Sequence, residues 1–251
     1  MSSERQALEE KSPWWGEHLH RYHEAAKHVT RTDSLLDLAC GTGFGTNLLA
    51  EHTEGMVIGG DLAASAIEES RKHWSRANLE FKVLDGVELL FEDAHFDKLV
   101  SFETIEHTER YREMLAEFSR VLKPGGTAFI STPNFPINSP GGVVTNPYHA
   151  QEFEYDEPLE LLSESFVSVK ILGQQYKRYR YDSGLSYSLA RLAEHAMYQR
   201  GVRKLPMGFQ DNLISMLIDK PMYPSLEDYE MTASEDEVLA CKTFYAICEK
   251  R

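Results

Sequence analysis

The sequence has few cysteines and no long hydrophobic run. Its 251 residues include three cysteines, Cys40, Cys241 and Cys248, and no CxxC pair. A disulfide framework or a cysteine-based zinc site is therefore not expected, and reduced thiols are typical of a cytosolic protein. Residues 1–15 are charged and do not resemble a secretory signal, and no apolar stretch approaches the ~20 residues of a membrane span. We expect a cytoplasmic protein without a membrane partner.

Basic residues are scarce relative to acidic ones. Lysine and arginine together number 26 against 40 aspartates and glutamates, which gives a formal net charge of -14. Proteins that bind a long phosphate backbone draw their affinity from lysine and arginine, so nucleic acid is disfavoured as a partner. The charge better suits a small-molecule or oligosaccharide acceptor.

Between residues 34 and 134, short β-rich runs alternate with amphipathic helical segments. The predicted strands are Ser34–Ala39, Met56–Gly60, Leu79–Leu84, Phe96–Phe102 and Thr127–Thr132. The predicted helices are Phe44–His52, Ala63–Trp74 and Arg110–Leu122. Strands that alternate with crossover helices form a parallel sheet with helices on both faces, so we expect an α/β fold.

A glycine-rich turn follows the first predicted strand. The run Leu36–Gly45 reads LDLACGTGFG, and glycines there let the backbone approach a ligand closely. Such a turn could bind a dinucleotide, but the third glycine of GxGxxG is missing. Asp37 lies directly before the turn, where a carboxylate would repel a pyrophosphate but suits the cationic methionine end of S-adenosylmethionine (SAM). We therefore expect SAM as the cofactor.

Two further aspartates lie at the ends of the next two predicted strands. Asp61 could accept hydrogen bonds from the ribose hydroxyls, and Asp85 from the adenine amino group. Each of them alone could equally be a strand-end cap, but the three acidic strand ends together point to the ligand-binding edge of an open α/β sheet. The predicted cofactor-binding residues are Asp37, Ala39, Gly41, Thr42, Gly43, Asp61, Leu62, Asp85, Gly86 and Phe102.

Three runs carry a resemblance to a known family. DLACGTGFGTNLLA, GGDLAASAIEES and FDKLVSFETIEHTERYREMLAEFSRVLKPGGTAFISTPN, within Ser34–Asn134, resemble the class I SAM-dependent methyltransferases. The resemblance implies a Rossmann-like, mostly parallel sheet of seven strands with an antiparallel last strand, for which Lys242–Glu249 is the candidate. Trp14–Tyr22 resembles the N-terminal helix that closes over SAM in bacterial relatives, which would place His20, Arg21 and Tyr22 within reach of the SAM carboxylate. A packing helix is the alternative.

We expect residues 1–251 to form a single methyltransferase domain with four parts. Its parts are an N-terminal helical lid (1–33), a SAM-binding core (34–175), a helical substrate cap (176–237) and a last strand (238–251). The core includes a helix at Glu157–Ser165 and a strand at Phe166–Leu172. Helices are expected in the cap around Leu185–Tyr198 and Asp211–Ile218. An insertion of this length usually has a function of its own; whether it also mediates a homodimer contact is left open.

A cluster of acidic and histidine residues follows the fourth predicted strand. If a helix begins at Glu103, then Glu103, Glu106 and His107 stand at i, i+3 and i+4 and share one face. Carboxylates and an imidazole that converge at the mouth of a cofactor site repel or desolvate one another unless a cation joins them. The pattern therefore indicates a divalent metal ion.

The ExxEH pattern resembles that of small-RNA 3′-terminal 2′-O-methyltransferases and of ubiquinone-pathway O-methyltransferases. In the RNA enzymes a further histidine ligand follows the fifth strand, and His149 in HAQEFEY occupies that place, with Tyr155 where the family has tryptophan. The resemblance implies a Mg²⁺ or Mn²⁺ site formed by Glu103, Glu106, His107 and His149. Glu106, His107 and His149 would be the catalytic residues. In metal-free relatives the histidine equivalent to His107 packs beside SAM, which is the alternative.

Three functions remain open. The segment from Asn146 to Tyr176 resembles bacterial methyltransferases that act on surface or storage polysaccharides, and tyrosines such as Tyr148 and Tyr176 could stack on sugar rings. A SAM-dependent O-methyltransferase acting on a sugar, oligosaccharide or glycoside, for example a methylated mannoside, is therefore favoured. The alternatives are methylation of RNA 3′ ends or of a catechol, and a non-catalytic SAM-binding regulator.

Overall fold

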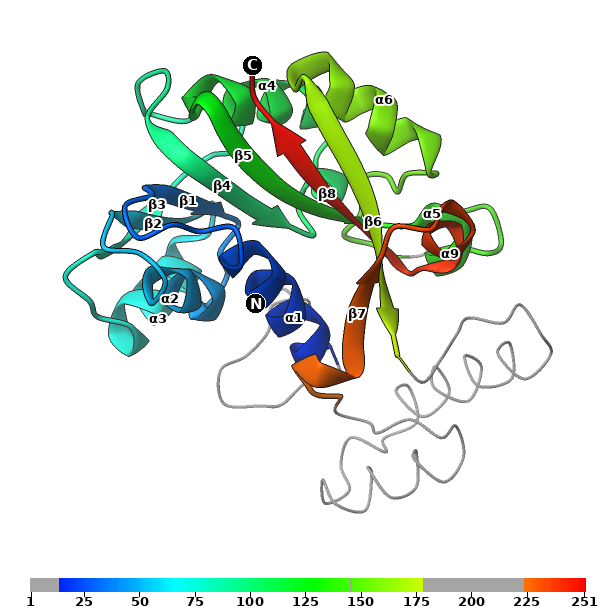
Figure 1. The fold of residues 1–251 in the computed structure, drawn as a ribbon, viewed down its shortest axis with the longest axis horizontal. Coiled ribbons are helices and arrows are strands. Elements are labelled where there is room, and N and C mark those ends of the chain that lie inside the picture. Colours follow the sequence, from blue (N-terminus) through cyan, green and yellow to red (C-terminus); the bar gives the residue numbers. More distant parts are fainter. Residues whose placement is uncertain (1–13, 145, 178–223) are drawn as a thin grey trace.

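The computed structural model describes residues 14–144, 146–177 and 224–251. They form one eight-stranded sheet with helices on both faces (Figure 1). The strands are β1 (Leu35–Leu38), β2 (Val57–Asp61), β3 (Leu79–Val83), β4 (Phe96–Phe102), β5 (Leu122–Pro133), β6 (Ser168–Tyr176), β7 (Tyr229–Thr232) and β8 (Thr243–Glu249). The α-helices are α1 (Trp15–Ala26), α2 (Phe44–Ala50), α3 (Ala64–His73), α4 (Tyr111–Val121), α5 (Phe135–Asn138), α6 (Asp156–Ser165) and α9 (Glu235–Ala240), and two short 3₁₀ helices are η1 (Ile105–His107) and η3 (Leu226–Asp228).

The strand order is β3-β2-β1-β4-β5-β8-β6-β7. The first five strands of this order run parallel, and β8 pairs antiparallel with both β5 and β6. The α/β fold and the antiparallel last strand are thus confirmed. Because β1 neighbours β4, the chain reverses its direction of winding there, and ligands of such sheets bind at the carboxyl ends of the strands at this point.

The expected number of strands was wrong by one. β7 pairs antiparallel with the end of β6, from Gly173↔Thr232 to Tyr176↔Tyr229, and forms an eighth strand. It lies within residues 176–237, where a helical cap was expected. β7 has only four residues, which is too short for a recognisable alternation of apolar and polar side chains. It is extended because it pairs with the free edge of β6. The two helices expected around Leu185–Tyr198 and Asp211–Ile218 lie outside the described residues.

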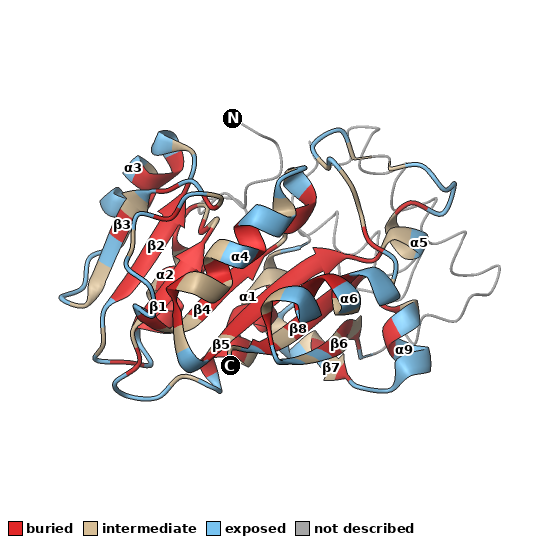
Figure 2. Cartoon of the chain, turned by 90° about the horizontal axis from the view of Figure 1, so that it is seen from above, coloured by how far each residue is buried: buried red, intermediate tan, exposed pale blue. Residues whose placement is uncertain are grey.

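Two apolar clusters fix the helices to opposite faces of the sheet. Phe118 of α4 and Leu99 of β4 belong to one buried cluster, and Leu49 of α2 and Val100 of β4 belong to the other. Consecutive strand residues point to opposite faces, so β4 contributes to both clusters. Figure 2 shows the buried residues concentrated along the strands between the two helical layers. Within the described residues, no helix is long and apolar enough to cross a membrane.

The core predicts a large stability difference between two leucines. Leu115 of α4 is fully buried, whereas Leu90 is 83% exposed. We expect Leu115→Ala to lower the free energy of unfolding by about 2–5 kcal/mol, through lost burial and the cavity left behind. The matched change Leu90→Ala should cost less than about 0.5 kcal/mol. Urea denaturation of both variants measures the difference, and equal midpoints would contradict the assignment of α4 to the core.

Candidate active site

The glycine-rich turn connects β1 to α2 in a backbone conformation that few residues adopt. Ala39, Gly41 and Gly43 have φ angles of +61°, +57° and +77°. A Cβ at Gly43 would lie 2.7 Å from the Phe81 ring, and one at Gly45 would lie 2.0 Å from the Tyr22 ring. The glycines therefore let α1 and β3 pack closely around the turn. Strained backbone of this kind clusters at ligand sites.

Asp37 is fully buried behind this turn, and both of its carboxylate oxygens accept hydrogen bonds. The Tyr22 hydroxyl donates to Oδ1 over 3.1 Å, and the Thr46 hydroxyl donates to Oδ2 over 2.6 Å. Burial raises the pKa of Asp37 to about 7, while the two hydroxyls act in the opposite direction. Asp37 thus connects α1 and α2 to the turn, and its ionisable carboxyl group lies behind the turn.

Asp61 and Asp85 follow the ends of β2 and β3, along the same edge of the sheet as Asp37. The Asp61 carboxylate accepts backbone N–H bonds from Gly41 over 3.1 Å and from Ala63 over 2.9 Å. Asp85 is exposed and accepts the N–H of Val87 over 3.1 Å. The expected alignment of the three carboxylates at one edge is therefore confirmed. Asp61 and Asp85 each also close a local turn, and contact of the three aspartates with SAM stays a prediction.

The remaining predicted cofactor residues lie along the same edge. Leu62, next to Asp61, is 71% exposed. Gly86 is buried, and a Cβ there would lie 2.8 Å from Leu38. Phe102 ends β4 and packs edge-on against Tyr22, with ring centroids 5.0 Å apart. Leu62 is thus exposed at this edge, whereas Gly86 and Phe102 are packed against their neighbours.

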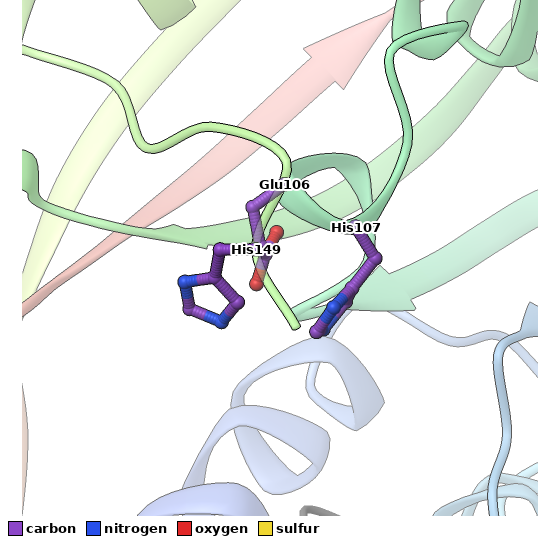
Figure 3. A group of neighbouring side chains, drawn as sticks. All are labelled: Glu106, His107 and His149. Atoms are coloured by element: carbon purple, nitrogen blue, oxygen red, sulfur yellow. The ribbon is translucent and has the colours of Figure 1, made fainter. Parts of the chain in front are cut away.

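Three of the four predicted metal ligands come together beyond the end of β4. The potential ligand atoms of Glu106, His107 and His149 all lie within 4.8 Å of one another (Figure 3). The two imidazole rings are nearly perpendicular, with centroids 4.9 Å apart. The N–H of Ala150 donates to the Glu106 carbonyl over 2.8 Å, which fixes the segment that carries His149 against η1.

The Glu106 carboxylate is buried and incompletely hydrogen-bonded. Its Oε2 accepts from the Thr132 hydroxyl over 3.2 Å, whereas Oε1 has no hydrogen-bond partner among the described residues. Burial, followed by the charge of Glu103, holds the pKa of Glu106 well above its usual range. A buried carboxylate with an unsatisfied oxygen is costly, so this group is stable only if it binds a proton or a cation.

Each histidine of the group is oriented by a hydrogen-bond acceptor. His107 Nδ1 lies 2.9 Å from the Tyr148 carbonyl, which can only accept, so Nδ1 carries a proton. His149 Nδ1 lies 2.8 Å from the Glu152 carboxylate, and Nε2 lies 2.9 Å from the Asn146 side-chain amide. Carbonyl and carboxylate partners of this kind orient metal-binding imidazoles in proteins.

The structure does not bring Glu103 into this group. The expected helix beginning at Glu103 was wrong: Glu103 has a φ of +50°, and η1 starts only at Ile105. Its Oε1 accepts from the Ser131 hydroxyl over 2.8 Å and lies 3.6 Å from Nη1 of Arg21. The left-handed turn at Glu103 therefore places its carboxylate against Ser131 and Arg21, although its charge still acts on Glu106.

Sequence reasoning missed the role of Arg21. It placed this residue near the SAM carboxylate, but the structure ties its guanidinium to the side chains of Glu103 and Gln174. Arg21 is 1% exposed, and an arginine on the buried face of an amphipathic helix is a signal that could have indicated an internal ion pair. Gln174 of β6 gave no such signal.

Comparisons with known proteins agree with this geometry. The family model described as "Methyltransferase domain" matches residues 36–130, a range that includes the turn, the three aspartates and the segment up to His107. Residues 36–130 therefore resemble a methyltransferase domain. A Mycolicibacterium smegmatis protein named "Probable S-adenosylmethionine-dependent methyltransferase" is 33% identical over 164 residues, which is 65% of this chain and 62% of the relative. This chain thus spans less than two thirds of that relative's length.

Two further similarities concern the reaction and the fold. A Coxiella burnetii ubiquinone biosynthesis O-methyltransferase is 33% identical over 111 residues, which is 43% of this chain and 44% of the relative. A Thermotoga maritima structure described as a SAM-dependent methyltransferase aligns with a TM-score of 0.61 at 15% identity and covers 95% of this chain and 91% of its own. The second similarity shows that the Rossmann-like methyltransferase fold extends beyond residues 36–130.

Asp37 predicts a specific dependence of stability on pH. Its pKa is raised from 3.8 to about 7 by folding, so the folded state binds this proton more tightly than the unfolded state. The resulting stabilisation is complete below the unfolded pKa and is lost as the pH rises from about 4 to 7. We expect the free energy of unfolding of the wild type, relative to Asp37→Asn, to fall by at most about 4 kcal/mol across this range.

Urea unfolding of both proteins at several pH values measures this difference. The Asp37→Asn variant is the matched control because it keeps the shape of the side chain and removes its titration. Parallel pH profiles for the two proteins would show that the buried carboxylate is not ionised differently in the folded and unfolded states.

Proposed function

We propose that this chain is a SAM-dependent O-methyltransferase that uses a divalent metal ion at Glu106, His107 and His149. Its proposed acceptor is a hydroxyl of a sugar, oligosaccharide or glycoside. The observation that carries the proposal is the convergence of these three side chains beyond the end of β4, next to the turn after β1. The named relatives support methyl transfer, and the Coxiella relative supports oxygen as the acceptor atom.

The residues present fit a divalent metal ion if His149 Nε2 exchanges its contact with the Asn146 side-chain amide for the ion. Glu106 offers an oxygen that has no hydrogen-bond partner among the described residues, and His107 and His149 each offer a ring nitrogen close to it. Glu152, which orients His149, is itself held by the Ser139 hydroxyl over 2.8 Å. Two imidazoles and a carboxylate suit Mn²⁺ or another transition ion better than Mg²⁺. When bound, the ion would lower the pKa of the acceptor hydroxyl.

The other contribution of the protein to the proposed reaction is to position SAM and the acceptor relative to each other. Transfer of a methyl group from a sulfonium is an in-line displacement, and the correct alignment of the two reactants supplies much of the rate. The turn after β1 and the carboxylates beside it would hold SAM, with α1 packed on the turn through Tyr22. The loop from Asn146 to Gln151, fixed to η1, would present the acceptor side of the site.

A sugar acceptor is supported by charge and by one exposed aromatic residue. The net charge of -14 favours a neutral glycan over RNA. Tyr148 is 45% exposed and directly precedes His149, so it is available for stacking on a ring, whereas Tyr176 is 1% exposed and is not. A catechol acceptor is the second candidate, on the similarity to the ubiquinone biosynthesis O-methyltransferase.

The proposed metal ion predicts the effect of a chelator. We expect methyl transfer from SAM to a panel of glycosides to be abolished by EDTA and restored by Mn²⁺. In the proposal, the ion held by Glu106 and the two histidines binds the acceptor hydroxyl, so its removal should stop the reaction. Methylation that EDTA does not affect would remove the metal ion from the proposal. Methylation of a catechol but of no glycoside would select the second acceptor.

Substitution of one histidine tests the site itself. We expect His149→Ala to lower turnover by more than ~100-fold, since even the outer partners of metal ligands are worth about 10- to 100-fold. SAM affinity should stay unchanged, because His149 lies on the acceptor side. The exposed His73, on α3, provides the matched control His73→Ala, which should behave as the wild type. Normal turnover by His149→Ala would refute the assignment.

A further inference from the structure

The N-terminal helix α1 contacts both halves of the active site through two consecutive residues. Tyr22 donates to Asp37 behind the cofactor turn, and its ring lies directly over Gly45. Arg21 lies 3.6 Å from Glu103, the first residue after β4. One helix therefore connects the turn that would hold SAM with the segment that leads to Glu106 and His107.

The Arg21 guanidinium needs Glu103 for electrostatic reasons. It is 1% exposed, and its hydrogen-bond partners Gln174 and His18 are neutral acceptors at 3.0 Å. The two carboxylates within ion-pair distance, those of Glu17 and Glu103, both lie 3.6 Å from Nη1. A buried cation without an anion is strongly destabilising, and of these two anions Glu103 alone comes from the sheet.

Glu103 is in turn held in position from several sides. Its N–H donates to the Ser131 carbonyl over 3.0 Å, and its carboxylate accepts from the Ser131 hydroxyl over 2.8 Å. Its φ of +50° costs energy for a residue with a side chain. Such strain persists only where the surroundings enforce it, and the surroundings here are β5 and α1.

We propose that Arg21 and Glu103 form a positioning pair that holds α1 on the cofactor turn and couples SAM affinity to the carboxyl end of β4. Glu103 acts through Arg21 and is not a metal ligand. Loss of the pair loosens α1 and weakens the Tyr22–Asp37 contact, while Glu106, His107 and His149 keep their own partners Thr132, Tyr148 and Glu152. The inference rests on the proposed function in that SAM is taken as the ligand of the turn.

The test is a double-mutant cycle with two ligands. The variants are Glu103→Gln, Arg21→Gln and the two combined, with SAM affinity measured by calorimetry and Mn²⁺ affinity by electron paramagnetic resonance. We expect each single change to raise the Kd for SAM roughly tenfold and the double change to raise it no further, because residues in contact couple. Mn²⁺ affinity should fall much less in Glu103→Gln, which removes only a nearby charge, than in the control Glu106→Gln, which removes a ligand.

Each contrary outcome is decisive. Additive effects on SAM affinity mean that the two residues act separately. A loss of Mn²⁺ affinity in Glu103→Gln as large as that in Glu106→Gln makes Glu103 a ligand. Either result overturns the inference. The urea midpoints of the same four proteins give a second double-mutant cycle, for stability, that needs no ligand. If the two residues couple in stability but not in SAM affinity, the pair has only a structural role. If Arg21→Gln does not fold, Arg21→Lys replaces it in the cycle.

Titrations of the wild type separate this inference from the proposed function. A wild type that binds no Mn²⁺ contradicts the metal site but leaves the SAM cycle to decide the inference. A wild type that binds no SAM contradicts the proposed function itself. If the wild type binds both SAM and Mn²⁺ but the SAM cycle shows no coupling, the inference fails and the proposed function stands.

Discussion

The buried carboxylate of Asp37 organises the cofactor side of this protein. A charge without solvent contact needs hydrogen-bond donors, and the two that it has come from different helices, Tyr22 of α1 and Thr46 of α2. The same contacts press α1 onto the glycine turn, where Gly45 leaves room for the Tyr22 ring. The turn, the N-terminal helix and the packing of Phe102 against Tyr22 all depend on this arrangement, as does the proposed placement of SAM.

Two carboxylates three residues apart have acquired different environments. Glu103 is partly exposed and paired with a guanidinium, whereas Glu106 is buried beside two imidazoles and has an unsatisfied oxygen. The left-handed backbone at Glu103 produces this separation, because it breaks the helical spacing that would have stacked the two side chains. Groups whose environments differ in this way take different roles in a reaction, which supports the proposed positioning role of Glu103 and the proposed cation binding by Glu106.

Several elements around the proposed site lie outside the matched family segment. Residues 36–130 contain the turn and the strand-end aspartates, which would serve any acceptor. The helix α1, the segment that carries His149 and the strands β6 to β8 surround the acceptor side of the sheet. Under the proposed function, variation there would change which molecule is methylated, because one fold serves many different reactions.

The sequence alone determined the elements of the core and the edge at which a ligand would bind. Strands such as Phe96–Phe102 and the aspartates that follow them are encoded by local periodicity, and the carboxyl ends of parallel strands meet at one edge. It also indicated that Glu106, His107 and His149 belong together. Only the tertiary structure showed that Glu103 lies outside the group of Glu106, His107 and His149 and pairs with the buried Arg21. It also showed the eighth strand, Tyr229–Thr232. These features depend on partners distant in the chain, Arg21 with Glu103 and Gln174, and β7 with the free edge of β6, which local periodicity does not encode.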